Sequence, residues 1–151
     1  MKNTNEMELI FDSLSANEGF VRVSVAAFLT QLNPTVEEVA DVKTAVSEAV
    51  TNAIIHGYDS EIHKIIVRCR MEKDTFFVEV EDKGKGMADV KKAMEPLFTT
   101  KPELERSGMG FSFMEAFMDS VSVESVLGEG TLVKMKKCIG KDRNIWTEPS
   151  L

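Results

Sequence analysis

The stretch Glu48-Ala-Val-Thr-Asn52-Ala-Ile-Ile-His56-Gly57 carries the strongest structural signal in the chain. Glu48, Asn52 and His56 recur every fourth residue, so on a helix they form one polar line beside an apolar stripe. Gly57 is a typical C-terminal stop for such a helix. The line is either a solvated helix face or a carboxylate and an amide oxygen held ready for one ligand.

Two alternating segments follow this helix. Residues 65–71 and 76–81 alternate apolar and polar side chains, which predicts two half-buried strands joined at Lys73-Asp74. Asp82 falls in phase with the apolar set, so the pleat directs its carboxylate toward the core, where an unpaired charge is costly. Gly84 and Gly86 come next. They indicate either a type I′ or II′ hairpin turn with a capping aspartate, or a backbone that approaches a flat ring closely.

A third motif, Gly108-Met-Gly110, precedes a predicted apolar helix over 110–118. A glycine pair at a helix N-terminus suits an anion bound by backbone N–H groups, and it equally suits an ordinary loop. Thr99, Thr100 and Lys101 lie just upstream and offer two hydroxyls and a cation. They either close over phosphates or belong to a solvated loop.

The remaining pattern predicts further helices and strands. Capping-box spacings at Ser15/Glu18 and Thr35/Glu38 predict helices that begin there and end near Leu32 and Gly57. We also expect a strand over 7–14, a short helix over 88–94, a loop over 96–107, and a hairpin of 121–126 with 131–135. Thr131 lies in phase with Val133, so its hydroxyl reaches a pocket floor or it is simply a β-branched strand residue.

The composition indicates an ordinary globular chain. Its 151 residues are 43% hydrophobic and 28% charged, which fits a single domain over 1–140 with a polar tail over 141–151. The net charge of −7 argues against binding to a nucleic-acid backbone. Cys69 and Cys138 show no metal-ligand spacing and are interpreted as reduced thiols. With no long apolar run and a polar start, we expect a soluble cytoplasmic protein that does not enter membranes.

Together the three motifs predict an ATP site. An Asn oxygen is a hard ligand suited to Mg²⁺, which also takes oxygens from phosphate and water. Glu48, one turn earlier, could orient or deprotonate a hydroxyl that attacks the γ-phosphate. Asp82 could accept a hydrogen bond from the adenine amino group.

The motifs are similar to the sequence boxes of the GHKL superfamily of ATP-binding domains, over residues 9–135. Two runs, 47–58 and 96–111, resemble the branch of anti-sigma serine kinases that regulate sporulation. This resemblance implies an α/β two-layer sandwich, with a mixed, mostly antiparallel sheet and helices on one face.

The resemblance also implies roles for single residues. Glu48 would be the general base, Asn52 the Mg²⁺ ligand, and Asp82 the group that reads adenine above Gly84 and Gly86. The residues expected to bind the nucleotide are Asn52, His56, Asp82, Gly84, Gly86, Thr99, Thr100, Lys101, Arg106, Ser107, Gly108, Gly110 and Thr131. Those at 99–101, 106 and 107 would form a lid.

Finally, the resemblance implies protein partners. It predicts a homodimer that binds and inhibits an RNA polymerase sigma factor and phosphorylates a serine of an anti-anti-sigma protein. Arg22 lies where the family's docking surface would be. Two alternatives remain: a related stress-response kinase with another client, and a nucleotide-dependent binding switch with negligible phosphotransfer.

Overall fold

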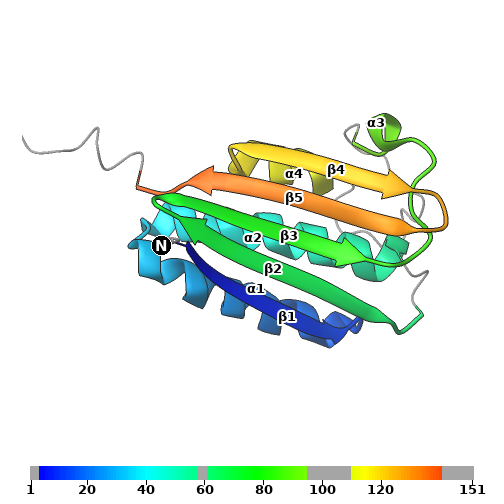
Figure 1. The fold of residues 1–151 in the computed structure, drawn as a ribbon, viewed down its shortest axis with the longest axis horizontal. Helices are drawn as coiled ribbons and strands as arrows, with labels where there is room; N and C mark the ends of the chain where they lie inside the picture. The colour runs from blue at the N-terminus through cyan, green and yellow to red at the C-terminus, as the bar shows by residue number, and fades with distance from the viewer. Residues whose placement is uncertain (1–3, 58–60, 95–109, 141–151) are drawn as a thin grey trace, which may run out of the picture.

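A computed structural model describes residues 4–57, 61–94 and 110–140 and shows one sheet with helices on one face (Figure 1). Its strands are β1 (Thr4–Asp12), β2 (Lys64–Glu72), β3 (Thr75–Asp82), β4 (Ser120–Val126) and β5 (Gly130–Cys138). They lie in the order β1-β2-β3-β5-β4, and all four pairings are antiparallel. The predicted two-layer α/β sandwich is confirmed. The parallel part of a mixed sheet is not found among these residues.

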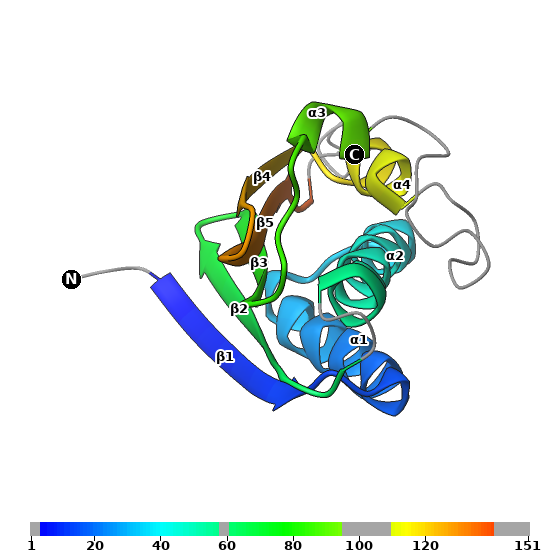
Figure 2. The same cartoon turned by 90° about the vertical axis from the view of Figure 1, so that its right-hand side faces the viewer.

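The helices form the second layer (Figure 2). They are α1 (Ser15–Leu29), α2 (Val36–Asn52), α3 (Val90–Ala93) and α4 (Gly110–Phe117), with a 3₁₀ turn η1 (Thr30–Leu32) and a π-helical turn η2 (Ala53–Gly57). α1, α2 and α4 cover the sheet, whereas the short α3 lies near the end of β4. No helix in the described ranges is long and apolar enough to cross a membrane.

The predicted capping box at the start of α2 is confirmed. The Thr35 hydroxyl accepts a hydrogen bond from the Glu38 N–H at 3.1 Å, and the Glu38 carboxylate accepts one from the Thr35 N–H at 2.8 Å. Glu38 is only 3% exposed, and its second oxygen accepts a hydrogen bond from the Gly140 N–H at 2.8 Å. The same side chain therefore starts the helix and fixes the end of β5 to it.

The predicted capping box at Ser15 is wrong. Leu14 occupies the cap position, Ser15 is already helical, and no side chain caps this end. The chain is tied here in another way, because the Asn17 amide donates a hydrogen bond to the Asp12 carbonyl at 2.9 Å. On this helix Phe20 is 63% exposed, whereas Val21 and Val25 are fully buried.

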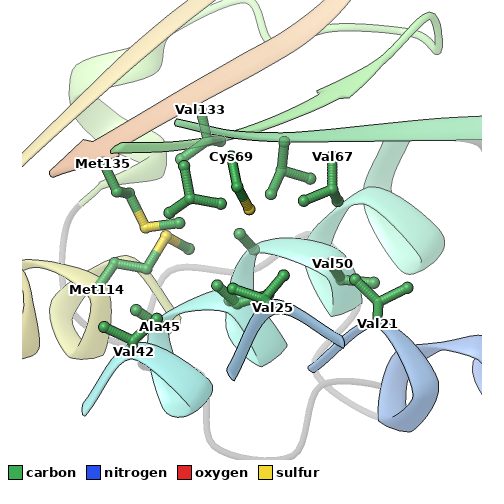
Figure 3. Close-up of a cluster of buried hydrophobic side chains, with 14 of the residues drawn as sticks. Val21, Val25, Val42, Ala45, Val50, Val67, Cys69, Met114, Val133 and Met135 are labelled. Atoms are coloured by element: carbon green, nitrogen blue, oxygen red, sulfur yellow. The ribbon is translucent and has the colours of Figure 1, made fainter. Parts of the chain in front are cut away.

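The core lies between the sheet and the three covering helices (Figure 3). The strands contribute the inward set of each alternating pattern, including Val67, Cys69, Val133 and Met135. Helix residues Val25, Val42, Ala45, Val50 and Met114 meet them from the other side. Since the pleat alternates strictly, burying these residues also fixes which polar residues face inward at the strand ends.

Candidate nucleotide site

Asp82 lies at the end of β3 and faces inward, as its phase predicted. Its side chain is 5% exposed, and burial raises the pKa of the carboxyl to about 6, although backbone N–H groups of Gly84 and Thr131 lower it in part. The Gly84 N–H donates to one carboxylate oxygen at 2.9 Å. Because few hydrogen-bond donors contact this buried carboxylate, it suits a ligand that supplies a further donor.

Gly57 and Gly84 let the backbone approach this carboxylate closely. A Cβ atom at position 57 would lie 2.8 Å from Asp82 Cγ, and one at position 84 would overlap the Gly57 carbonyl. The Lys85 N–H also donates to the Gly57 carbonyl at 2.8 Å. The end of the helical segment and the end of β3 therefore meet directly, and only glycine fits at both positions.

The hairpin interpretation of the Asp82–Gly86 segment is wrong. β3 pairs with β2 and β5, so the strand that follows it in the chain is not its neighbour. Gly86 has φ +72, and a Cβ atom there would overlap the Val126 carbonyl. Gly86 is thus required by a left-handed turn that rests on the β4–β5 hairpin, while its predicted position beneath a base stays a prediction.

Glu48 and Asn52 meet the first residue of α4. A Cβ atom on Gly110 would lie 3.1 Å from Asn52 Nδ2 and 3.4 Å from Glu48 Oε2. Both side chains are half-buried, so the interpretation as a freely solvated helix face is wrong. Residues 58 or more positions apart in the chain are brought together here because α2 packs along α4.

His56 lies on the π-helical turn rather than on α2. A π turn holds more residues than an α turn, so the four-residue spacing no longer places His56 directly above Asn52. The side chain is half-buried. Its predicted part in nucleotide binding stays a prediction.

Thr131 is the cross-strand partner of Asp82, which places both side chains on the same face of the sheet. The Thr131 hydroxyl oxygen lies 2.9 Å from that of Ser125 on β4. The sequence prediction that this hydroxyl lies on the inner face therefore agrees with the strand register.

Arg22 lies on α1 and forms an ion pair with Glu18 at 3.7 Å. It also lines a hollow of about 400 Å³ between α1 and α2, which extends to Glu48. The other residues around this hollow are Ala40, Lys43, Thr44 and Ser47. Arg22 therefore borders the same hollow as the predicted catalytic carboxylate, a relationship that the motifs do not indicate.

Several predicted nucleotide-binding residues lie outside the described part of the chain: Thr99, Thr100, Lys101, Arg106, Ser107 and Gly108. Their roles stay predictions. Within the described ranges, no group of three or more His, Cys, Asp or Glu side chains could hold a metal ion. A Mg²⁺ ion bound mainly through phosphate and water, with one protein oxygen, needs no such group.

Two contacts of the site were not anticipated from the sequence. Gly57 was interpreted only as a helix stop, whereas it also packs against Asp82. Ser125 was not considered, although its hydroxyl joins Thr131 and the Met87 N–H. It alternates in phase with Val121 and Val123, so the reasoning that selected Asp82 would also have selected Ser125.

Comparison with known proteins supports this fold. Residues 12–137 match the family described as the histidine kinase-like ATPase domain. Two solved structures share the fold. The RsbU and RsbW domains of a Mycobacterium tuberculosis protein give a TM-score of 0.64 at 19% identity, covering 89% of this chain and 32% of that one. A histidine kinase domain from Erythrobacter litoralis gives a TM-score of 0.53 at 17% identity, covering 87% of this chain and 63% of that one.

The fold and the sequence match thus define the chain as a member of the histidine kinase-like ATPase domain family, which implies nucleotide binding. Curated relatives narrow the assignment. A Thermoanaerobacter protein is 57% identical over 95% of this chain and 100% of its own length, and an Oceanobacillus iheyensis protein is 52% identical over 94% and 98%. Both are named anti-sigma F factor, and the chain belongs to that family.

Proposed function

We propose that the protein is an anti-sigma factor and a protein-serine kinase. It binds and inhibits an F-type RNA polymerase sigma factor, and it uses Mg-ATP to phosphorylate a serine of an anti-anti-sigma protein during sporulation. The proposal rests on one observation: Glu48 and Asn52 lie close to Gly110 at the C-terminal end of α2. The turn that follows this end of α2 places Gly57 against Asp82.

The residues present fit a magnesium–nucleotide complex. Gly57, Gly84 and Gly110 let the backbone approach closely around Asp82, Asn52 and Glu48, and Asp82 is a buried carboxylate able to accept a hydrogen bond from an adenine amino group. Asn52 would supply one oxygen to Mg²⁺, which when bound neutralises developing charge on the phosphates. The glycine-bearing start of α4 would direct backbone N–H groups at those phosphates.

Glu48 would act as the general base. As the acceptor serine oxygen bonds to the γ-phosphorus, its proton passes to the Glu48 carboxylate, and ADP leaves with the electrons of the broken bond. Phosphoryl transfer asks the protein mainly to place these groups. The hollow between α1 and α2 ends at Glu48, so an acceptor loop held there would reach the base.

Glu48→Gln tests the enzymatic part. We expect it to keep ATP affinity and to lose phosphotransfer to the acceptor protein by about 10²-fold or more, because general-base catalysis contributes about that much. Glu37→Gln, exposed in the first turn of the same helix, is the matched control. Undiminished transfer by the Glu48 variant rejects the base assignment and favours a nucleotide-dependent binding switch.

Arg22 would contact the protein partners. Arg22→Ala should weaken binding of the sigma factor or of the acceptor while ATP affinity is kept, and Arg70→Ala on β2 is the control. Capture of clients from the source cell distinguishes a sporulation client from a stress-response client. Light scattering tests the proposed homodimer. A cytoplasmic location is part of the same proposal, because a sigma factor acts on RNA polymerase there.

A further inference from the structure

Lys137 is a cation on the inner face of β5. It pairs with the buried Phe76 of β3 and alternates in phase with Val133 and Met135, which belong to the core. Directly paired residues on neighbouring strands point to the same face, so the lysine side chain enters the layer between the sheet and the helices. The side chain is only 14% exposed. A charge in such a position requires partners.

The partners of Lys137 lie on two different helices. Its ammonium donates a hydrogen bond to the carbonyl of Phe117, the last residue of α4, at 2.6 Å, and lies 3.6 Å from a carboxylate oxygen of Asp41 on α2. The last carbonyls of a helix have no partner within it and carry the negative end of its dipole. Since α4 has no basic residue in its own last turn, β5 supplies the cation instead.

Two further hydrogen bonds hold the residue after this end of α4 to β5. The Asp119 N–H donates to the Lys136 carbonyl at 2.9 Å, and the Asp119 carboxylate accepts from the Cys138 N–H at 2.7 Å. Both involve a residue beyond the helix. Among these three links to β5, the one from Lys137 is the contact that reaches the helix itself.

The opposite end of α4 is the end that the proposed function uses. Its first residue, Gly110, lies against Glu48 and Asn52 of α2, and the two helices pack side by side (Figure 2). Phe117 follows Gly110 by seven residues, just as Glu48 follows Asp41, so the helices run antiparallel with two contacts about 10 Å apart. Because α4 is a single short helix, a shift of its last residue also moves its first.

We propose that Lys137 is a positioning residue for phosphate binding and transfer. By holding the C-terminal end of α4 to β5, it fixes where Gly110 stands beside the end of α2 that carries Glu48. This inference rests on the proposed function, because it assumes that the start of α4 faces the phosphates. The base end of the nucleotide is independent of this contact, since Asp82 belongs to β3.

Titration with ATP and with adenosine, under conditions in which each variant is fully folded, tests the proposal. Lys137→Met keeps most of the length of the side chain and removes its charge and its donors. It should raise the ATP dissociation constant about three- to tenfold, as expected for one lost hydrogen bond, and leave the adenosine value nearly unchanged. Lys136→Met, exposed at the neighbouring position of β5, is the matched control and should change neither value.

Phosphotransfer is the second readout. At saturating ATP, Lys137→Met should lower kcat about tenfold or more and leave KM for the acceptor protein unchanged, because the phosphate is misplaced and the acceptor is not. Lys137→Arg keeps the charge and the donors and should restore most of kcat. Asp41→Asn removes the ion pair but leaves the bond to Phe117, so it should stay near wild type. If Lys137→Met does not fold, Lys137→Gln removes the charge and should show the same pattern.

The proposal is overturned by unchanged ATP affinity in the folded Lys137 variant, by equal weakening of ATP and adenosine, or by equal losses in Lys136→Met. Equal weakening of both ligands would mean that Lys137 only supports the fold. Failure of the proposed function is recognised separately, because wild-type protein would then bind ATP no better than Asp82→Asn does and would transfer no phosphate.

Discussion

Gly57 lies directly against the carboxylate of Asp82, so that a Cβ atom at position 57 would come within 2.9 Å of both carboxylate oxygens. One residue ends the helical segment that carries Glu48 and Asn52, and the other ends β3. The contact fixes the distance between the proposed base-recognition group and the proposed catalytic helix. Any side chain at position 57 must move one of them.

Gly57→Ala should therefore lower both stability and ATP affinity. A methyl group forced into this contact costs about 1–3 kcal/mol of unfolding free energy. Displacement of Asp82 should weaken ATP binding about tenfold, the loss expected when one buried hydrogen bond is misplaced. Urea unfolding and ATP titration measure the two effects.

Gly19→Ala is the matched control for this substitution. Gly19 is helical, and the nearest atom to a Cβ there, Arg22 Nη2, is 3.7 Å away. Alanine should therefore stabilise α1 by about 0.5–1 kcal/mol. Equal behaviour of the two alanine variants would contradict the importance of the Gly57–Asp82 contact.

The buried Asp82 carboxyl makes stability depend on pH. Its pKa of about 6 in the folded protein exceeds the ordinary 3.8, so the folded state binds more protons between these values. Stability should rise as pH falls from about 6 to about 4, and the cost of burying the charge is fully present at pH 7.

Asp82→Asn should remove this dependence. It should stabilise the nucleotide-free protein at pH 7 by at most about 3 kcal/mol, the equivalent of the difference in pKa, while it weakens ATP binding. Urea unfolding at pH 4.5, 5.5 and 7 measures the slope. Asp74→Asn, at an exposed turn, should leave the slope as it is. A slope that survives in the Asp82 variant would assign the pH dependence to another group.

Local sequence patterns predicted the elements whose position depends on one buried face or on a few neighbouring residues. The period-2 alternation gave β2 and β3 nearly at their bounds and turned Asp82 inward, because slipping by one residue would expose the whole apolar set. The cap at Thr35 followed from its own four-residue window. The cap at Ser15 did not, because the start of α1 also depends on where β1 ends and on the Asn17–Asp12 hydrogen bond.

The site shows the same division. Motifs selected Glu48, Asn52, Asp82 and Gly110, but their meeting depends on how α2 packs against α4 and β3, which no local window contains. The π-helical turn at Ala53–Gly57 likewise had no local signal, and it moved His56 off the predicted line. The chemical role of each site residue could be predicted from its residue type, whereas the relative positions of these residues required the tertiary structure.

The two cysteines should differ in reactivity. Cys69 on β2 is 1% exposed, and burial raises the pKa of its thiol to about 12, whereas Cys138 on β5 is half-buried. Because the thiolate is the reactive form, a disulfide reagent at pH 8 should label Cys138 in the native protein and Cys69 only after unfolding. A Cys69→Ala variant should lose only the labelling that requires unfolding and keep the labelling of Cys138. Native labelling of two thiols at one rate would contradict the burial of Cys69.

Glu38 should matter for stability without affecting the nucleotide site. Glu38→Ala leaves the Thr35 N–H at the start of α2 and the buried Gly140 N–H without their acceptor, which together should cost about 2–4 kcal/mol. Glu37→Ala, at the exposed neighbouring position, is the control for lost negative charge in the first turn. Urea unfolding measures both variants.

ATP affinity of the folded Glu38 variant should remain at the wild-type value. Glu48 follows Glu38 by ten residues of helix, a rise of about 15 Å. The Glu38–Gly140 hydrogen bond and the proposed nucleotide site therefore lie at different ends of α2. Titration under conditions in which the variant is fully folded measures this. A weakened ATP affinity there would show that the position of α2 against β5 is transmitted along the helix to Glu48 and Asn52.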